Sequence, residues 1–154
     1  MDGFYIQRLR EEDLPFLYRE EGGETDGLRD FFLRHLKWQE EGSCVILVAW
    51  APGGRAVGRL IVLLDDSMPP DYQTVMPSLT DLLVYPPFRR QGVANGLLAC
   101  GEDEAARMSD NCFLTVEAGE GFASARRLYE KRGFVADPSR GRDPICMIKT
   151  LKHR

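Results

Sequence analysis

Residues 85–98, YPPFRRQGVANGLL, combine two prolines, two arginines and a glycine with the start of an apolar pattern. An apolar run from Leu79 to Val84 precedes this stretch and ends at two prolines. After a basic, glycine-containing turn, small or apolar residues recur about one helical turn apart, at Val93, Leu97, Gly101, Ala105 and Met108. An apolar run stopped by proline and followed by this period predicts a strand, a turn and a helix.

The turn between this strand and this helix is the place to look for a ligand. A helix that begins near Gln91 or Gly92 leaves several backbone N–H groups without an intrahelical partner, and such an end attracts anions. Gly92 and Ala94 are small enough to let a phosphate approach the main chain, and Arg89 and Arg90 add permanent positive charge. The turn therefore fits a pyrophosphate, although an ordinary strand-to-helix connection with solvated arginines has the same spacing.

Three segments resemble the GNAT family of N-acetyltransferases. RRQGVA at 89–94 resembles the family's Arg/Gln-x-x-Gly-x-Gly/Ala signature, which grips the pyrophosphate of acetyl-coenzyme A. DLLVYP at 81–86 looks like the family's fourth strand with its closing Pro. ARRLYEKRGF at 125–134 looks like its late Leu-Tyr-Glu-Lys-x-Gly-Phe motif. Together these segments stand in the right order and cover about residues 79–134.

The resemblance implies where the cofactor and the proton donor lie. In the family, the fourth and fifth strands splay apart to admit acetyl-coenzyme A. Exposed backbone N–H groups around Leu82 to Val84 could then serve the thioester carbonyl and pair with the pantetheine amides as another strand would. The cofactor-binding positions carried over in this part of the chain are Leu82, Leu83, Val84, Arg89, Arg90, Gln91, Gly92, Val93, Ala94 and Asn95. Tyr129 stands at the position of the family's tyrosine, the general acid that protonates the departing thiolate, and a phenol is protonated at neutral pH.

The base that deprotonates the amine has several candidates. Glu117, twelve residues before Tyr129, matches by ungapped spacing the glutamate of members that resemble ribosomal-protein alanine acetyltransferases. Asp81 on the fourth strand is the second candidate, and Glu20 or Glu21 could act from the acceptor side. A solvated or strand-edge carboxylate is the alternative at each position, and burial with a raised pKa would distinguish them. Some family members rely on ordered water instead.

One position departs from the family pattern. In Asn-x-x-Ala-x-x-Leu-Tyr, common in the family, the asparagine precedes the late helix and helps hold the cofactor, and ungapped counting places Phe122 there. Either Ser124 replaces the asparagine through a small shift, or Phe122 packs on the pantetheine. Both alternatives alter the geometry of cofactor binding without abolishing it.

Bulk composition fits one domain spanning residues 1–154. With 44% apolar and 29% charged residues, the chain is globular and long enough for one core. A net charge of -4 argues against nonspecific nucleic-acid binding, and no apolar run is long enough to span a membrane. Four cysteines without a C-x-x-C pair or a preceding secretory signal indicate reduced thiols in a cytoplasmic protein. Neither His35 nor His153 has a second metal-type ligand at helical spacing, so we expect no metal.

The order of elements predicts a single α/β domain with a central mixed, mostly antiparallel sheet of about six to seven strands and helices on both faces. We expect strands near residues 4–9, 44–50, 57–64, 79–84, 112–116, 134–135 and 145–151. We expect helices from Leu14 to about Arg19 with Asp13 as cap, near 28–38, from 91 or 92 to about 108, and from Ser124 to Gly133. Residues 20–27, acidic and glycine-rich, should form a mobile surface loop, and residues 65–77 a long connection near the acceptor.

These observations predict an N-acetyltransferase that moves acetyl from acetyl-coenzyme A to a primary amine by direct attack in a ternary complex. The acidic segments 20–26 and 65–71 favour a small cationic amine, and a peptide N-terminus or a lysine is open. A coenzyme A-binding sensor or regulatory module without turnover is the main rival. A nucleotide-binding doubly wound domain ranks last, because the chain has neither a Walker A sequence nor a complete dinucleotide fingerprint. The family often forms homodimers, but no stretch of this sequence identifies an interface.

Overall fold

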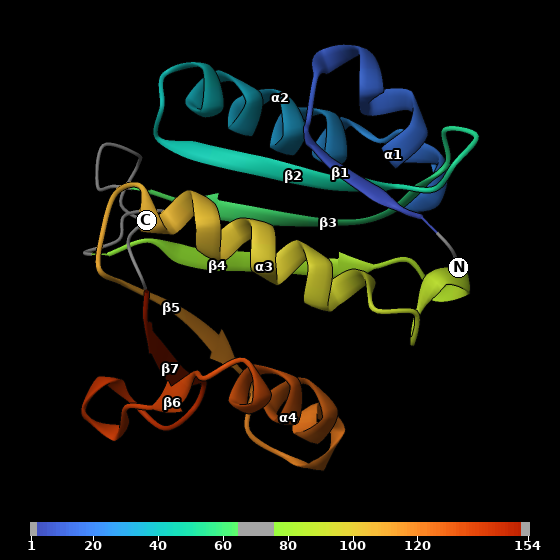
Figure 1. Cartoon of the computed structure of the whole chain (residues 1–154). Coiled ribbons are helices and arrows are strands. Elements are labelled where there is room, and N and C mark those ends of the chain that lie inside the picture. Colours follow the sequence, from blue (N-terminus) through green and yellow to red (C-terminus); the bar gives the residue numbers. More distant parts are fainter. Residues whose placement is uncertain (1–2, 65–75, 152–154) are drawn as a thin grey trace.

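A seven-stranded sheet forms the centre of the protein in our computed structural model, which describes residues 3–64 and 76–151 (Figure 1). The strands are β1 (Tyr5–Arg8), β2 (Cys44–Trp50), β3 (Ala56–Leu63), β4 (Ser78–Val84), β5 (Asn111–Val116), β6 (Val135–Ala136) and β7 (Ile145–Thr150). Their order across the sheet is β1-β2-β3-β4-β5-β7-β6. Only the β4–β5 pair is parallel, which confirms the predicted mixed, mostly antiparallel sheet.

Helices cover both faces of this sheet, as predicted. They are α1 (Leu14–Glu20), α2 (Asp26–Glu40), α3 (Val93–Ala106) and α4 (Ala123–Lys131). Every residue of β2 and β3 is buried, because alternate side chains enter two different cores. Ile46 and its alternate neighbours pack with α1 and α2, whereas Leu47 and its alternate neighbours pack with α3. Accordingly, α3 lies on one side of the sheet and α1 and α2 on the other (Figure 1).

The parallel strands β4 and β5 separate almost at once. They share a single paired position, Ser78 with Phe113, and the Phe113 N–H donates to the carbonyl of Pro77 at 3.0 Å. Beyond this point β4 continues to Val84 and β5 to Val116 without another paired position. The predicted splay between the fourth and fifth strands is therefore confirmed.

A β-bulge interrupts β4 on its other side, where it pairs with β3. Arg59 pairs with Leu83 and Ile61 with Thr80, so that two β4 residues, Asp81 and its neighbour, lie opposite one β3 residue. Asp81 has φ +53°, a left-handed conformation that costs a non-glycine residue about 1–2 kcal/mol. A bulge redirects the backbone that follows it, here the end of β4.

Two local expectations are wrong. The segment 20–27 is not a mobile surface loop throughout, because Glu20 ends α1 and the side chains of Glu20 and Glu21 are each only 8% exposed, in ion pairs with arginines. Asp13 precedes α1 but does not cap it with its side chain, which instead accepts from the Arg10 N–H at 2.9 Å. Most of the predicted connection 65–77 lies outside the described residues.

Candidate active site

The turn before α3 presents an uncapped helix N-terminus. After a short 3-10 turn at Pro86–Phe88, Gly92 takes φ +82° as the N-cap, and α3 begins at Val93. The Gly92 carbonyl accepts from the Gly96 N–H at 3.0 Å, and no side chain among residues 3–64 and 76–151 caps the N–H groups of the first turn. Free N–H groups and the positive end of the helix dipole together favour a bound anion.

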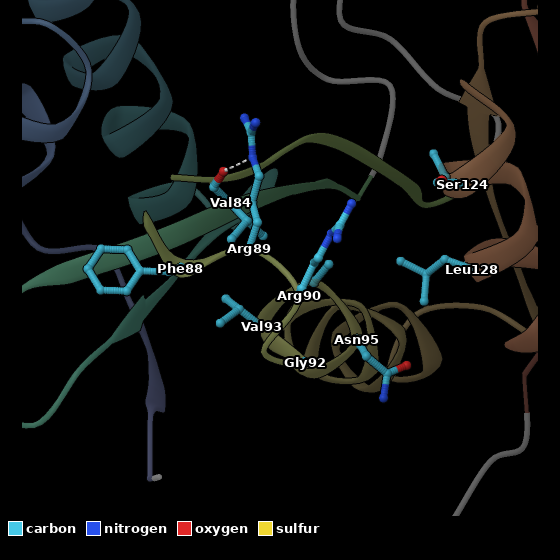
Figure 2. Close-up of a pocket in the computed structure, with 11 residues that line it drawn as sticks. Val84, Phe88, Arg89, Arg90, Gly92, Val93, Asn95, Ser124 and Leu128 are labelled. Carbon is cyan, nitrogen blue, oxygen red and sulfur yellow. Dashed lines mark hydrogen bonds between the residues drawn. The ribbon is translucent and has the colours of Figure 1, made fainter. Parts of the chain in front are cut away.

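A cavity of about 450 Å³ lies between this turn and α4 (Figure 2). Its lining residues are Val84, Phe88, Arg89, Arg90, Gly92, Val93, Ala94, Asn95, Ser124, Ala125 and Leu128. The fold thus brings Ser124 to the same cavity as the α3 turn, which lies about thirty residues earlier in the chain. This turn is the segment at which the sequence predicts the cofactor. Four of the predicted binding residues are not in its lining: Leu82, Leu83, Gln91 and Phe122. Phe122 is 45% exposed, whereas Ser124 stands at the cavity wall.

The two arginines of the turn differ in their contacts. Arg89 donates from Nε to the carbonyl of Val84 at 3.1 Å, which ties the turn to the end of β4 (Figure 2). Arg90, at φ +64°, has no hydrogen-bond or ion-pair partner within residues 3–64 and 76–151. Its side chain lies between the α3 turn and Ser124 of α4 (Figure 2). A free guanidinium at an uncapped helix end is well suited to phosphate.

A partly buried ion-pair network joins α3 to the end of α4. Arg132, at the end of α4, donates from Nη1 to Asn95 Oδ1 at 2.6 Å and from Nε to Glu102 Oε2 at 2.6 Å. Glu102, a buried residue of α3, also pairs with Lys149 of β7 at 2.5 Å. Asn95, which lines the cavity, is therefore held by the same side chain that anchors α4.

Tyr129 follows a cavity-lining residue, Leu128, but does not itself line the cavity. Its ring stands edge-on to Phe134, with centroids 6.3 Å apart. Burial raises the pKa of the Tyr129 phenol above its ordinary value, so the group is protonated at neutral pH. That state is the one a proton donor needs.

The candidate bases fall into two groups. Glu117, just after β5, and Asp81, at the bulge of β4, are both exposed. Glu20 is bonded twice by Arg55, at 2.9 and 3.0 Å, and these hydrogen bonds lower the pKa of its carboxyl. Glu21 is likewise held by Arg59, at 2.8 and 2.9 Å. The Glu20 carboxylate is therefore poorly suited to accept a proton from an amine, and both oxygens of Glu21 are already engaged.

Sequence reasoning missed a second buried polar network, beside the bulge. Arg59, on β3, is 9% exposed and bonds Glu21 through two of its nitrogens and the Asp81 carbonyl through Nη1 at 3.1 Å. The hydroxyl of Tyr85 donates to the same carboxylate at 2.6 Å. The sequence does contain a signal for this network. The run AVGRLIVL is apolar except for one arginine, and an arginine is rarely buried unless it is paired.

His35 and the other potential metal ligands of the described residues lie apart from one another. His35 is 1% exposed in an aromatic cluster, with Nδ1 2.7 Å from the carbonyl of Phe31, and burial lowers its pKa. In the described part of the chain, no three His, Cys, Asp or Glu side chains are grouped so that they could hold a metal ion. Nor is any described helix both long and apolar enough to cross a bilayer.

The chain matches the model of the Acetyltransferase (GNAT) family over residues 6–134. The splayed strands, the turn before α3 and the cavity beside them agree with this match. The protein belongs to the GNAT acetyltransferase family, and membership implies acetyl-coenzyme A-dependent N-acetylation.

Solved structures share this fold along nearly the whole chain. The PaiA N-acetyltransferase of Thermoplasma acidophilum, in complex with coenzyme A, is 19% identical with a TM-score of 0.68, covering 97% of this chain and 99% of that one. The ribosomal-protein-S18-alanine N-acetyltransferase of Escherichia coli is 20% identical with a TM-score of 0.68, covering 99% and 96%. A GNAT acetyltransferase of Streptococcus pneumoniae is 18% identical with a TM-score of 0.69, covering 97% and 100%. At such identities the likeness shows the fold alone, and no curated protein sequence matches this chain.

Proposed function

We propose that this protein transfers an acetyl group from acetyl-coenzyme A to a primary amine by direct attack in a ternary complex. The observation that carries the proposal is the cavity between the α3 turn and α4. It combines a helix end and the guanidinium of Arg90, neither of which has a side-chain partner among the described residues. The cavity lies beside the end of β4, the strand that has just parted from β5. The α3 turn on one side of the cavity suits phosphates, and the end of β4 suits an amide-containing chain.

The residues present fit the two ends of coenzyme A. The N–H groups of Val93 and Ala94, with Arg90, would hold the pyrophosphate, and Gly92 leaves room for it. The main chain at the end of β4 would pair with the pantetheine amides as a neighbouring strand would, since β5 no longer pairs there. When bound, acetyl-coenzyme A supplies an activated thioester, so no covalent enzyme intermediate is required.

We assign proton transfer to Tyr129 and to one exposed carboxylate. Glu117 at the end of β5 is the proposed base, with Asp81 at the bulge as the second candidate, because Glu20 and Glu21 are bonded to arginines. Tyr129 gives its proton to the departing thiolate, which its raised pKa permits at neutral pH.

Tyr129→Phe removes only the phenolic hydroxyl and tests the proton donor. Since general-acid catalysis contributes about 10²–10⁴-fold, we expect kcat to fall by about that factor, with the Kd for acetyl-coenzyme A changed less than about twofold. Steady-state thiol release and equilibrium titration measure the two quantities. A kcat equal to that of the wild type would exclude Tyr129 as the acid.

The preference for a cationic acceptor loses part of its support. Every acidic side chain of the segment 20–26 is paired with an arginine. Glu20 pairs with Arg55, Glu21 with Arg59, and both Glu24 and Asp26 with Arg29. The other acidic segment, 65–71, lies outside the described residues. We therefore propose a primary amine as acceptor, with small-molecule and peptide amines tested on equal terms.

A panel of amines distinguishes the activities. The purified protein is mixed with acetyl-coenzyme A and, in separate reactions, a polyamine, an aminoglycoside, a peptide with a free N-terminus and a blocked peptide containing lysine. Amine-dependent thiol release in any of them supports the enzyme. Tight coenzyme A binding without release would instead favour a sensor, the reading that the departure at Phe122 motivates.

A further inference from the structure

Arg59 connects two parts of the protein that are far apart in sequence. Its Nε and Nη2 atoms bond the Glu21 carboxylate, in the turn after α1, at 2.8 and 2.9 Å. Its Nη1 atom donates to the Asp81 carbonyl, in the bulge of β4, at 3.1 Å. The guanidinium also lies 5.5 Å from the ring centroid of Phe32, on α2. One buried side chain thus contacts α1, α2 and β4.

The Asp81 carbonyl is the point at which this contact affects β4. Asp81 occupies the left-handed region at φ +53°, which a residue with a side chain adopts only when its surroundings enforce it. The register changes here, so the backbone from Leu82 to Val84 is aimed differently from an unbulged strand. The donor at Nη1 satisfies a carbonyl that the bulge displaces from the ladder.

The Glu21 carboxylate fixes the guanidinium in turn. Arg59 bonds it in the two-pronged manner of a planar fork, and the hydroxyl of Tyr85 donates to it at 2.6 Å. Both oxygens of the Glu21 carboxylate are engaged, and the side chains of Glu21 and Arg59 are only 8% and 10% exposed. These contacts hold the guanidinium of Arg59 in one orientation. Tyr85 immediately follows β4, so the network contacts the chain on both sides of Leu82–Val84, at Asp81 and at Tyr85.

We infer that Arg59 is a positioning residue: held by Glu21, it fixes the bulge at Asp81 and thereby aims the backbone of Leu82–Val84 at the pantetheine and thioester of acetyl-coenzyme A. This inference rests on the proposed function of the cleft. It assigns the pyrophosphate to the α3 turn and the thioester end to a strand whose geometry depends on a distant ion pair. The two ends of the ligand should therefore respond differently when that pair is changed.

The test uses a double variant, Arg59→Met with Glu21→Gln. Removing both charges avoids a lone buried charge, and glutamine keeps an oxygen for the Tyr85 hydroxyl. The Asp81 carbonyl then loses its donor. Arg59→Lys is the second variant: it keeps the charge beside Glu21, but one ammonium cannot reproduce the fork and the third contact together. Urea unfolding establishes that each variant is folded.

The matched control is Arg8→Met with Glu104→Gln. This pair also joins two elements, β1 and α3, through one ion pair at 2.9 Å, and the change in charge is the same. Within the described part of the chain, neither residue lines the cavity or bonds a residue of β4. We expect turnover and ligand affinity equal to those of the wild type.

Three quantities are measured for each protein: kcat, the Kd for acetyl-coenzyme A and the Kd for ADP, which carries the pyrophosphate without the pantetheine. For both Arg59 variants we expect kcat to fall by about a hundredfold, as for a misplacement of about 1 Å. The Kd for acetyl-coenzyme A should rise about tenfold, with the Kd for ADP within about twofold of the wild type. This split supports the inference.

Other outcomes overturn it. A folded Arg59→Lys or double variant with wild-type kcat and wild-type affinity would show that Arg59 does not aim β4. Equal losses of affinity for acetyl-coenzyme A and ADP would assign Arg59 a role in stability alone. If the wild type itself turns over no amine, the proposed function fails, and the ratio of the two Kd values still decides whether Arg59 positions the strand.

Discussion

Gly92 combines open space with a backbone conformation that favours glycine. Its φ is +82°, and a Cβ built there would meet no atom within 4 Å, so a side chain would extend into the cavity that Gly92 lines. Gly42 has nearly the same conformation, φ +86°, and equally free surroundings, but lies in the turn between α2 and β2. Substituting each glycine in turn therefore separates two effects: the loss of stability from the backbone conformation, and the loss of space for a ligand.

Gly92→Leu and Gly42→Leu should lose similar stability, about 1–2 kcal/mol each, because both force a side chain into the left-handed region. Only Gly92→Leu should lose affinity for acetyl-coenzyme A, by at least about tenfold, which corresponds to one lost charge-assisted contact. Urea unfolding and ligand titration measure these effects. Equal affinity in the two variants would mean that the α3 turn does not hold the phosphates.

Arg90 is the more accessible positive charge of the turn, since Arg89 is bonded to the Val84 carbonyl. We expect Arg90→Gln to weaken acetyl-coenzyme A binding about tenfold and to reduce the dependence of Kd on salt, because a charge that faces phosphates is lost. The control is Arg19→Gln on α1, an exposed arginine with the same change in charge. Equal salt dependence in both variants would contradict the assignment.

At the scale of elements, α3 and α4 form the two walls of the cavity, and Arg132 holds them together. It is 17% exposed in its side chain and bonds both Asn95 and the buried Glu102. Arg126, on the same helix α4, is 44% exposed and approaches Glu130 only to 3.9 Å. The two arginines differ in burial and in partners but not in type.

Arg132→Met should lower the free energy of unfolding by about 2 kcal/mol, because a buried carboxylate loses one of its two cationic partners. Arg126→Met should change it by less than about 0.5 kcal/mol, since an exposed i,i+4 pair contributes little. Chemical denaturation compares the variants. If both variants lost the same free energy of unfolding, the contacts of Arg132 between α3 and α4 would not stabilise the protein.

The elements differ in how far the sequence could predict them. The strand, turn and helix at 79–106 were predictable because an apolar run, two prolines and a helical period are local signals. The bulge at Asp81 and the burial of Glu21 were not, because both depend on Arg59, which reaches them only through the tertiary fold. Similarly, Ser124 could be placed at the cavity only through a motif, whereas the bond of Arg132 to Asn95 joins residues with no local relation.

At the scale of the whole molecule, burial of weak acids sets the response of stability to alkaline pH. Burial raises the pKa of Cys112 to about 12, and it also raises the pKa values of Tyr85 and Tyr129. Their ordinary values are about 8.5 for Cys and 10 for Tyr. The unfolded chain therefore releases these protons first as pH rises. The contribution of these three groups to stability is complete below about pH 8.5 and is lost progressively as pH rises toward 12.

Cys112→Ala should flatten this loss. Each group that is deprotonated in the unfolded chain but protonated in the folded protein contributes a slope of about 1.4 kcal/mol per pH unit. Between about pH 9.5 and 11, the variant should therefore lose stability more slowly than the wild type by about that amount per unit. Urea unfolding at several pH values provides both slopes. Parallel slopes would show that the Cys112 thiol titrates alike in both states.

Thermal unfolding shows whether the cavity beside β4 binds acetyl-coenzyme A. The purified protein is heated with acetyl-coenzyme A, coenzyme A, ATP or NAD at one concentration, since a ligand that binds only the folded state raises Tm. At about a hundredfold excess over Kd, both coenzyme A forms should raise Tm by about 5–10 °C, and ATP and NAD by much less. A folded protein with no selective shift from the coenzyme A forms would contradict the account.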